Sequence, residues 1–269
     1  MEAEPFYDEF AAKEWRRLER HRTEFAVSLR ALNEFLPDPP APILDIGGGP
    51  GRYAIELAQR GYRVTVLDIS AESLRLARQK AKEAQVELAG LIHANAVDLG
   101  ELLSNSYEAV LLMGPLYHLL AREERERAVR EATRVLRPRG RLFAAFITRF
   151  APFRYVASAD PGWLTEHPSY AGQLLETGLH DQPTRFAKAY YAHPDEVVPL
   201  MESCGQRTLA LLGCEGVVAG HESKVNELEG DAWEAWVDLN YILAQEPALY
   251  GASDHLMYVG EKAEQTGGT

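Results

Sequence analysis

One short segment, residues 43–51, constrains the fold of this chain more than any other part of its sequence. It reads ILDIGGGPG, an apolar strand pattern that ends in glycines and continues into a helical pattern. Because glycine has no Cβ, the backbone of such a loop can approach a ligand closely where the first strand of a parallel sheet ends. The segment therefore predicts an α/β fold with a ligand site at the carboxyl ends of its strands.

Apolar runs and helical periodicity alternate along the rest of the chain. Strands are predicted at residues 43–46, 62–68, 88–94, 109–113, 142–147, 208–212 and 254–262. Helices are predicted at residues 8–36, 71–84, 123–136, 194–203 and 233–244, with another between the glycine loop and residue 60. This alternation is typical of a mostly parallel sheet that helices cover on both faces, so we expect a Rossmann-like α/β fold.

The composition of the segments predicts how the chain is divided. Residues 1–42 are expected to form an N-terminal helical lid and a proline-rich linker, and residues 43–262 the main domain. Two aromatic-rich insertions, about 148–189 and 216–252, dilute the alternation after the fifth and sixth strands. We expect them to cover a largely apolar small-molecule pocket, with most of their aromatic side chains forming the insertions' own core. The remaining residues, 263–269, are expected to be a flexible tail.

Charge and cysteine content narrow the class of partner. The chain has 28 Lys and Arg against 40 Asp and Glu, which gives a net charge of −12. Nucleic-acid binding needs a clustered basic surface, so we expect no nucleic-acid partner. Its two cysteines suit reduced thiols, its first ten residues lack a signal-peptide pattern, and no apolar run is long enough to span a membrane. We therefore expect a cytoplasmic protein without a membrane partner.

Asp68 ends the second predicted strand, nineteen residues after Gly49. A carboxylate at this place can accept hydrogen bonds from both ribose hydroxyls of an adenosine, which predicts a nucleoside-containing cofactor. Residues 49–54, GPGRYA, also satisfy the dinucleotide pattern G-x-G-x-x-A, which keeps a nicotinamide dinucleotide open. Pro50, however, removes a backbone N–H from the loop, and the Asp45 carboxylate would repel a phosphate but suit an ammonium group. These residues favour S-adenosylmethionine.

The ordered motifs resemble those of the class I S-adenosylmethionine-dependent methyltransferases. The pattern DxGxGxG at residues 45–51, followed by Asp68, is similar to the first two motifs of that family. Later stretches that resemble family motifs are residues 93–99, 108–119 and 134–140. Asn95 replaces a common Asp near the adenine, where an amide can still form hydrogen bonds. The resemblance covers roughly residues 7–262 and implies a seven-stranded sheet with an antiparallel last strand, and S-adenosylmethionine as the cofactor.

The resemblance also implies which positions face the cofactor. Asp45 would face its methionine portion, Asp68 its ribose and Met113 its sulfonium. The implied cofactor-binding residues are Asp45, Gly47, Gly49, Gly51, Asp68, Ile69, Asn95, Ala96 and Met113.

Methyl transfer from a sulfonium depends on orientation and desolvation, so no metal is expected, and a base is needed only for a protonated acceptor. His118, five residues after Met113, is the main candidate base, and a role in shaping its loop is equally compatible with the sequence. Tyr117, which is next to His118, either contacts the substrate or simply packs against the protein. Tyr7 either closes over the sulfonium with its ring face or packs within an amphipathic helix.

These observations predict a methyltransferase that acts on a small-molecule acceptor by in-line transfer. Two alternatives stay open: a nicotinamide-dependent oxidoreductase, and a non-catalytic S-adenosylmethionine-binding protein. The expected oligomeric state is a monomer or a homodimer.

Overall fold

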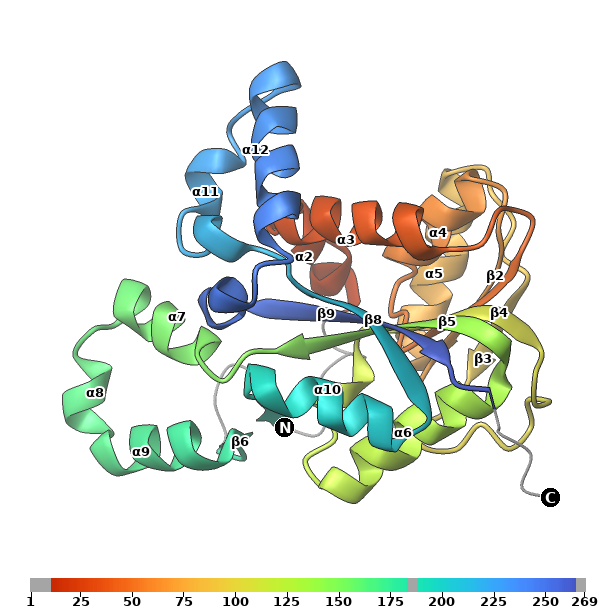
Figure 1. The fold of residues 1–269 in the computed structure, drawn as a ribbon. Coiled ribbons are helices and arrows are strands. Elements are labelled where there is room, and N and C mark those ends of the chain that lie inside the picture. The colour runs from red at the N-terminus through yellow and green to blue at the C-terminus, as the bar shows by residue number, and fades with distance from the viewer. Residues whose placement is uncertain (1–10, 183–187, 265–269) are drawn as a thin grey trace.

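The computed structural model describes residues 11–182 and 188–264. At its centre lies a seven-stranded sheet with the order β3-β2-β1-β4-β5-β9-β8 (Figure 1). The strands are β1 (Pro42–Ile46), β2 (Arg63–Asp68), β3 (Gly90–His93), β4 (Tyr107–Leu112), β5 (Leu136–Ile147), β8 (Gln206–Gly213) and β9 (His255–Lys262). The expected seven-stranded, Rossmann-like sheet is confirmed.

Strand pairing divides the sheet into a parallel and an antiparallel part. β1 pairs in parallel with β2 on one side and with β4 on the other, and β4 pairs in parallel with β5. β9 runs antiparallel to both of its neighbours, β5 and β8. The strand order reverses between β1 and β4, and ligands of open α/β sheets bind in the crevice outside the carboxyl ends of strands at such a switch point.

Helices cover both faces of the sheet (Figure 1). One face carries α3 (Arg22–Phe35), α4 (Arg52–Gln59) and α5 (Ala71–Glu83), and the other carries α6 (Arg122–Val135) and α10 (Pro194–Ser203). Each face has its own apolar core, and the fully buried neighbours Leu111 and Leu112 of β4 belong to different ones. Side chains alternate across a strand, so a continuous apolar run supplies both cores at once.

The helix predicted at residues 8–36 is broken in the structure. Residues 11–15 are helical, α2 (Arg17–Arg20) follows, and His21 leaves the helical region with φ −105° and ψ 58° before α3 begins. α3 packs into the core through Val27 and Leu32, neither of which is exposed. The proposed lid is therefore limited to the residues before α3.

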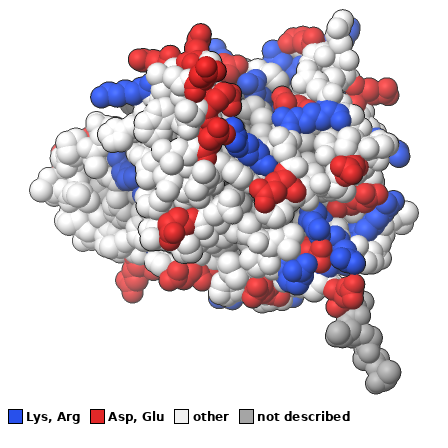
Figure 2. All heavy atoms as spheres, turned by 45° about the horizontal axis from the view of Figure 1, so that its top comes forward, with Lys and Arg blue, Asp and Glu red and all other residues white. Residues whose placement is uncertain are grey.

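A lobe that lies outside the sheet follows β5 (Figure 1). It contains α7 (Ala151–Ala159), α8 (Trp163–Glu166), α9 (Pro168–Thr177) and the short pair β6 (Leu179–His180) and β7 (Ala189–Tyr190). Tyr170 lies at ring-centre distances of 6.0 Å from Trp163 and 6.1 Å from His180. These aromatic rings therefore pack on one another, and Figure 2 shows few charged side chains on the part of the lobe that faces the viewer.

A second group of helices follows β8, and its longest member stands beside α3. This group contains α11 (Glu222–Val225) and α12 (Gly230–Leu243), with short 3₁₀-helices at η2 (Gly216–Val218) and η3 (Pro247–Ala252). α12 exposes Trp236, Leu239 and Ile242. Neither α12 nor any other helix in the described part of the chain is long and apolar enough to cross a membrane.

Candidate active site

A cleft lies at the carboxyl ends of β1, β2 and β4, at the switch point of the sheet. It encloses about 1060 Å³ of space between atoms, including open solvent at its mouth. The strand ends and their loops contribute Asp45, Gly47, Gly48, Gly49, Pro50, Leu67, Asp68, Ile69, Ala94, Asn95, Ala96, Met113, Gly114, Pro115, Tyr117, His118 and Leu119. The N-terminal segment contributes Glu14, Arg17 and Leu18, and the start of α4 contributes Arg52 and Tyr53.

The glycine loop forms the floor of this cleft, and its conformation explains its composition. Gly47 and Gly49 adopt φ values of +68° and +54°, a region that side chains with a Cβ rarely occupy. A Cβ on Gly47 would lie 2.6 Å from Pro115 Cδ, and one on Gly48 would lie 2.6 Å from Asp45 Oδ2. The loop can therefore pass between β1 and the segment after β4 only because these side chains are missing.

Asp68 is buried at the end of β2 and is fixed by the backbone. Its Oδ2 accepts a hydrogen bond from the Gly49 N–H at 2.8 Å, and its Oδ1 accepts one from the Ser70 N–H at 2.8 Å. Burial raises the pKa of Asp68, although these two hydrogen bonds act in the opposite direction. Each oxygen keeps a further lone pair, so the carboxylate can accept hydrogen bonds from a vicinal diol without moving.

Asp45 is only 2% exposed, and its Oδ2 accepts no hydrogen bond from the described residues. Burial, together with the nearby Asp68 carboxylate, raises the pKa of Asp45 to about 7. A buried carboxyl oxygen without a partner is costly, and a bound cation would remove that cost. The position thus favours a ligand that carries an ammonium or sulfonium group.

The loop after β4 brings Tyr117 and His118 into the same cleft. His118 Nδ1 lies 3.2 Å from the Lys188 carbonyl oxygen, so in the neutral ring Nδ1 carries the proton and Nε2 the lone pair. Burial lowers the pKa of His118 to about 4, which keeps the imidazole neutral at physiological pH. Burial raises the pKa of Tyr117, which keeps its phenol protonated. His118 is therefore the acceptor of this pair and Tyr117 a hydrogen-bond donor.

The N-terminal segment supplies a wall of charged residues that sequence reasoning missed. Arg17 donates from Nε to Glu14 at 2.8 Å and binds both carboxylate oxygens of Glu24 at 2.6 and 3.0 Å. In the sequence Arg17 belongs to a run of alternating Arg and Glu, a pattern that indicates a solvated helix face. Arg17 nevertheless lines the cleft, whereas its neighbours Arg16 and Arg20 are exposed, and the local sequence does not distinguish between them.

Almost all of the expected cofactor-binding residues line this one cleft. The residues that do so are Asp45, Gly47, Gly49, Asp68, Ile69, Asn95, Ala96 and Met113. Gly51 does not line it: with φ +83° it caps α4, and a Cβ there would lie 3.2 Å from Ala77 Cβ of α5. Tyr7 lies outside the described residues, so its expected role stays a prediction.

The two expected insertions do not contribute to the cleft wall within the described residues. Some of their aromatic side chains are exposed, such as Tyr155 and Trp236, and Trp233 packs against Arg22 of α3. Arg149, just after β5, forms an ion pair with Glu196 at 2.8 Å rather than facing a ligand. The expectation that these insertions cover the acceptor therefore has no support from the cleft lining.

Comparison with known proteins identifies the fold's family. Residues 44–144, which run from β1 through most of β5, match the family model described as a methyltransferase domain. The part of the chain from β1 to β5 is thus a methyltransferase domain. The match identifies S-adenosylmethionine, rather than a nicotinamide dinucleotide, as the cofactor that the fold is built to bind.

Relatives of this methyltransferase domain include enzymes with different acceptors. The chain is 27% identical over 175 residues to the ubiquinone biosynthesis O-methyltransferase of Coxiella burnetii, covering 64% of this chain and 65% of that protein. It is 26% identical over 213 residues to the tRNA 5-carboxymethoxyuridine methyltransferase of Escherichia coli O157:H7, covering 77% and 75%. The chain thus spans less than two thirds of the first of these relatives.

A solved structure shares the fold over nearly the whole chain. An S-adenosylmethionine-dependent methyltransferase of Thermotoga maritima superposes with a TM-score of 0.60 at 18% identity, covering 97% of this chain and all of that one. At this identity the likeness establishes the fold alone.

Proposed function

We propose that this protein transfers the methyl group of S-adenosylmethionine to a small-molecule acceptor. The single observation that carries the proposal is the cleft itself. It brings a diol-binding carboxylate, Asp68, and an unpartnered buried carboxyl oxygen, on Asp45, to the same switch point as the Tyr117–His118 loop.

The residues present fit S-adenosylmethionine better than a dinucleotide. The cofactor carries a sulfonium and an ammonium group, and Asp45 offers a buried carboxylate without a described partner. Asp68 would accept the ribose hydroxyls, Ile69 and Ala96 would pack against the adenine, and Met113 would lie beside the sulfur. Pro50, which has no N–H, makes the loop a poor cradle for a pyrophosphate.

When bound, S-adenosylmethionine supplies a methyl group on a good neutral leaving group, so displacement is a matter of alignment. The glycine loop, the N-terminal segment and the loop after β4 all line the cleft, and contact of these segments with a bound cofactor would displace water from it. Tyr117 and His118 lie after β4, beside Met113, where an acceptor would approach. We assign His118 Nε2 to accept a hydrogen bond from the acceptor's O–H or N–H, and Tyr117 to orient it.

A small acceptor is supported by charge and by the cleft. The net charge is −12, and on the face shown in Figure 2 acidic and basic side chains are interspersed rather than gathered in a basic patch. A tRNA acceptor, which one relative uses, needs a basic track along its phosphates. We further propose that the protein needs no membrane partner and works as a monomer or homodimer.

The decisive experiment uses S-adenosylmethionine with an isotopically labelled methyl group. The protein is incubated with a metabolite extract and, separately, with total tRNA, and the labelled products are identified. We expect label in a small molecule and none in tRNA. Label in tRNA alone would overturn the acceptor class, and cofactor binding without any labelled product would favour a non-catalytic binding protein.

A further inference from the structure

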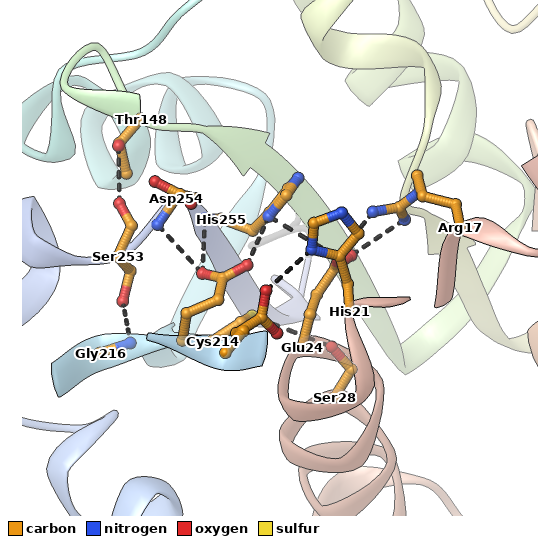
Figure 3. Close-up of polar contacts among 12 residues, drawn as sticks. Arg17, His21, Glu24, Ser28, Thr148, Cys214, Gly216, Ser253, Asp254 and His255 are labelled. Carbon is orange, nitrogen blue, oxygen red and sulfur yellow. Dashed lines mark hydrogen bonds and ion pairs between the residues drawn. The ribbon is translucent and has the colours of Figure 1, made fainter. Parts of the chain in front are cut away.

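Four charged side chains form a series of ion pairs, here named the charge chain, that begins at the cofactor cleft and ends beyond it; Glu24 and Glu215 are buried, and Arg17 and His255 are partly buried. Arg17, in the cleft wall, binds Glu24 of α3; Glu24 Oε2 lies 3.7 Å from His255 Nδ1; and His255 Nδ1 lies 2.5 Å from Glu215 Oε1. Figure 3 shows Glu24 between Arg17 and His255, with the three residues reaching in from different parts of the chain. The charges alternate in sign along the chain, so each group contacts an opposite one.

The far end of this charge chain is fixed to the backbone of the sheet. Glu215, which follows β8, accepts hydrogen bonds at Oε2 from the backbone N–H groups of Asp254 and His255 at 3.0 and 2.8 Å. It is 1% exposed, and Glu24 is 5% exposed. This charge chain therefore links the start of β9 to the N-terminal segment, residues 11–20, of which only Ala11 and Leu18 are buried.

Both central groups are held in their charged forms. Although burial acts in the opposite direction, Arg17 and His255 lower the pKa of Glu24 to about 2. Likewise, Glu24 and Glu215 raise the pKa of His255 to about 9 against the effect of burial. Other charged groups that face His255 are Arg17, which acts to lower its pKa, and Asp254, which lies next to it in sequence.

The same three side chains, Glu24, Glu215 and His255, could in principle hold a metal ion, since their ligand atoms lie within 4.8 Å of one another. Their hydrogen bonds argue against this. Arg17 occupies both oxygens of Glu24, and backbone N–H groups and the His255 ring occupy those of Glu215. A proton on His255 already fills the place that a cation would take.

We propose that His255 and Glu215 are positioning residues for cofactor binding, which act through Glu24 to hold Arg17 and its segment as one wall of the cleft. Neither His255 nor Glu215 is among the residues that line the cleft. Arg17 is paired with Glu14 and with Glu24, and Glu24 in turn forms an ion pair with His255 at 3.7 Å. Cofactor affinity thus depends on residues outside the binding site, and this inference rests on the proposed function.

The test measures binding rather than activity. The affinity for S-adenosylhomocysteine is determined by calorimetry for the wild type, His255→Gln, Arg17→Met and the double variant, at a temperature far below unfolding. We expect each single variant to weaken binding about tenfold, within the usual range of coupling between sites. The double variant is expected to lose little more than either single one, because both break the same chain.

Asp254→Asn is the matched control. It removes the neighbouring carboxylate, which is paired with Arg154 at 2.7 Å and not with Glu24, and we expect its affinity to stay within twofold of the wild type. Glu215→Gln serves as a second variant in case His255→Gln does not fold, because the amide oxygen can still accept from the backbone while the charge is lost. Hydrogen exchange at residues 11–20 should be faster in His255→Gln and Glu215→Gln than in the wild type, and unchanged in Asp254→Asn.

The outcomes separate this inference from the proposed function. If the wild type binds no S-adenosylhomocysteine, the proposed function fails. If the wild type binds but His255→Gln and Glu215→Gln bind within twofold of it, the positioning role is overturned. The positioning role would also be overturned if Asp254→Asn lost as much affinity as His255→Gln and Glu215→Gln, or if the losses of affinity were fully additive in the double variant.

Discussion

Asp68 receives two backbone hydrogen bonds before any ligand is bound, so its carboxylate needs no rearrangement to accept a ribose. Replacing Asp68 with Ala removes a charged acceptor, and we expect the binding of S-adenosylmethionine to weaken by about 2 kcal/mol, roughly thirtyfold. Calorimetry measures this loss. Glu108→Ala, which removes a surface carboxylate paired with Arg137 far from the cleft lining, is the control, and unchanged affinity in Asp68→Ala would refute the assignment.

Because Asp45 changes its protonation state near neutral pH, it couples cofactor binding to the release of a proton. Because burial and Asp68 raise its pKa to about 7, close to half of the molecules carry a proton on Asp45 at pH 7 when no cofactor is present. A bound cation favours the ionised form, so binding should release roughly half a proton per site at this pH, and affinity should fall as the pH drops below 7. Calorimetry in buffers of different ionisation enthalpy counts these protons. Asp45→Asn should release none, and a heat independent of the buffer in the wild type contradicts the prediction.

His118 is a neutral acceptor throughout the physiological range. With a pKa of about 4, its protonation cannot limit the rate between pH 5.5 and 8, so we expect turnover to show no loss from this group there. His118→Ala should lower turnover by roughly a hundredfold while leaving cofactor affinity nearly intact. Tyr117→Phe, which keeps the ring that lies 4.7 Å from His118, is the matched variant for the neighbouring hydroxyl. A loss of cofactor affinity equal to the loss of rate would show that His118 only supports the loop.

At the scale of elements, the N-terminal segment and α3 should behave differently. α3 is anchored by fully buried residues such as Val27 and Leu32, whereas residues 11–20 bury only Ala11 and Leu18 and are also held by the ion pairs of Arg17. We expect S-adenosylhomocysteine to slow hydrogen exchange in residues 11–20 and to leave α3 unchanged. Equal exchange in residues 11–20 with and without the ligand would exclude a lid at this place.

Elements with strong local signals could be predicted from the sequence, and the break in the N-terminal helix could not. The α10 helix has the predicted bounds because Pro194 and Glu196 start it with a complete capping box at His193. The break at His21 has a different origin: His21 pairs with Glu222 at 2.9 Å, and Glu24 is drawn to His255. Those partners lie about two hundred residues away in the sequence, beyond the reach of periodicity.

In the candidate site, too, some residues could be predicted from the sequence and others could not. The glycine loop and Asp68 follow predicted strands, so the strand pattern placed them at the carboxyl edge of the sheet, whereas the place of Met113 was implied by the resemblance to the methyltransferase motifs. Arg17 and Glu14 could not, because a charged residue in an amphipathic helix carries no sign of whether it faces solvent or a cleft. The acceptor side depends on such tertiary placement, which explains why it was harder to predict.

For the whole molecule, the buried charges predict how stability changes with pH. The folded-state pKa of His255 is raised to about 9, so its contribution is complete below about pH 6.5 and is lost as the pH rises through 9. Asp45, an acid whose pKa is raised to about 7, also loses its contribution as the pH rises through that value. Glu24, with a pKa lowered to about 2, loses its contribution only in strong acid.

Together, the contributions of His255, Asp45 and Glu24 predict that the folded protein is most stable in mildly acidic solution. The free energy of unfolding of the cofactor-free protein, measured with urea, should be a few kcal/mol higher at pH 6 than at pH 9.5. His255→Gln and Asp45→Asn should each flatten this dependence. Equal stability of the wild type at the two pH values would contradict the assigned charge states.

The position of β9 has a consequence for how the protein is made. It is the last described strand in chain order, yet it lies inside the sheet, between β5 and β8. During synthesis the parallel strands can pair as they emerge from the ribosome, but β8 has no strand to join until β9 follows it. Until then β5 and β8 each present an unpaired backbone row, the kind of surface to which other nascent chains adhere. The interval between the synthesis of β8 and that of β9 is therefore when these two strands are most open to wrong pairing.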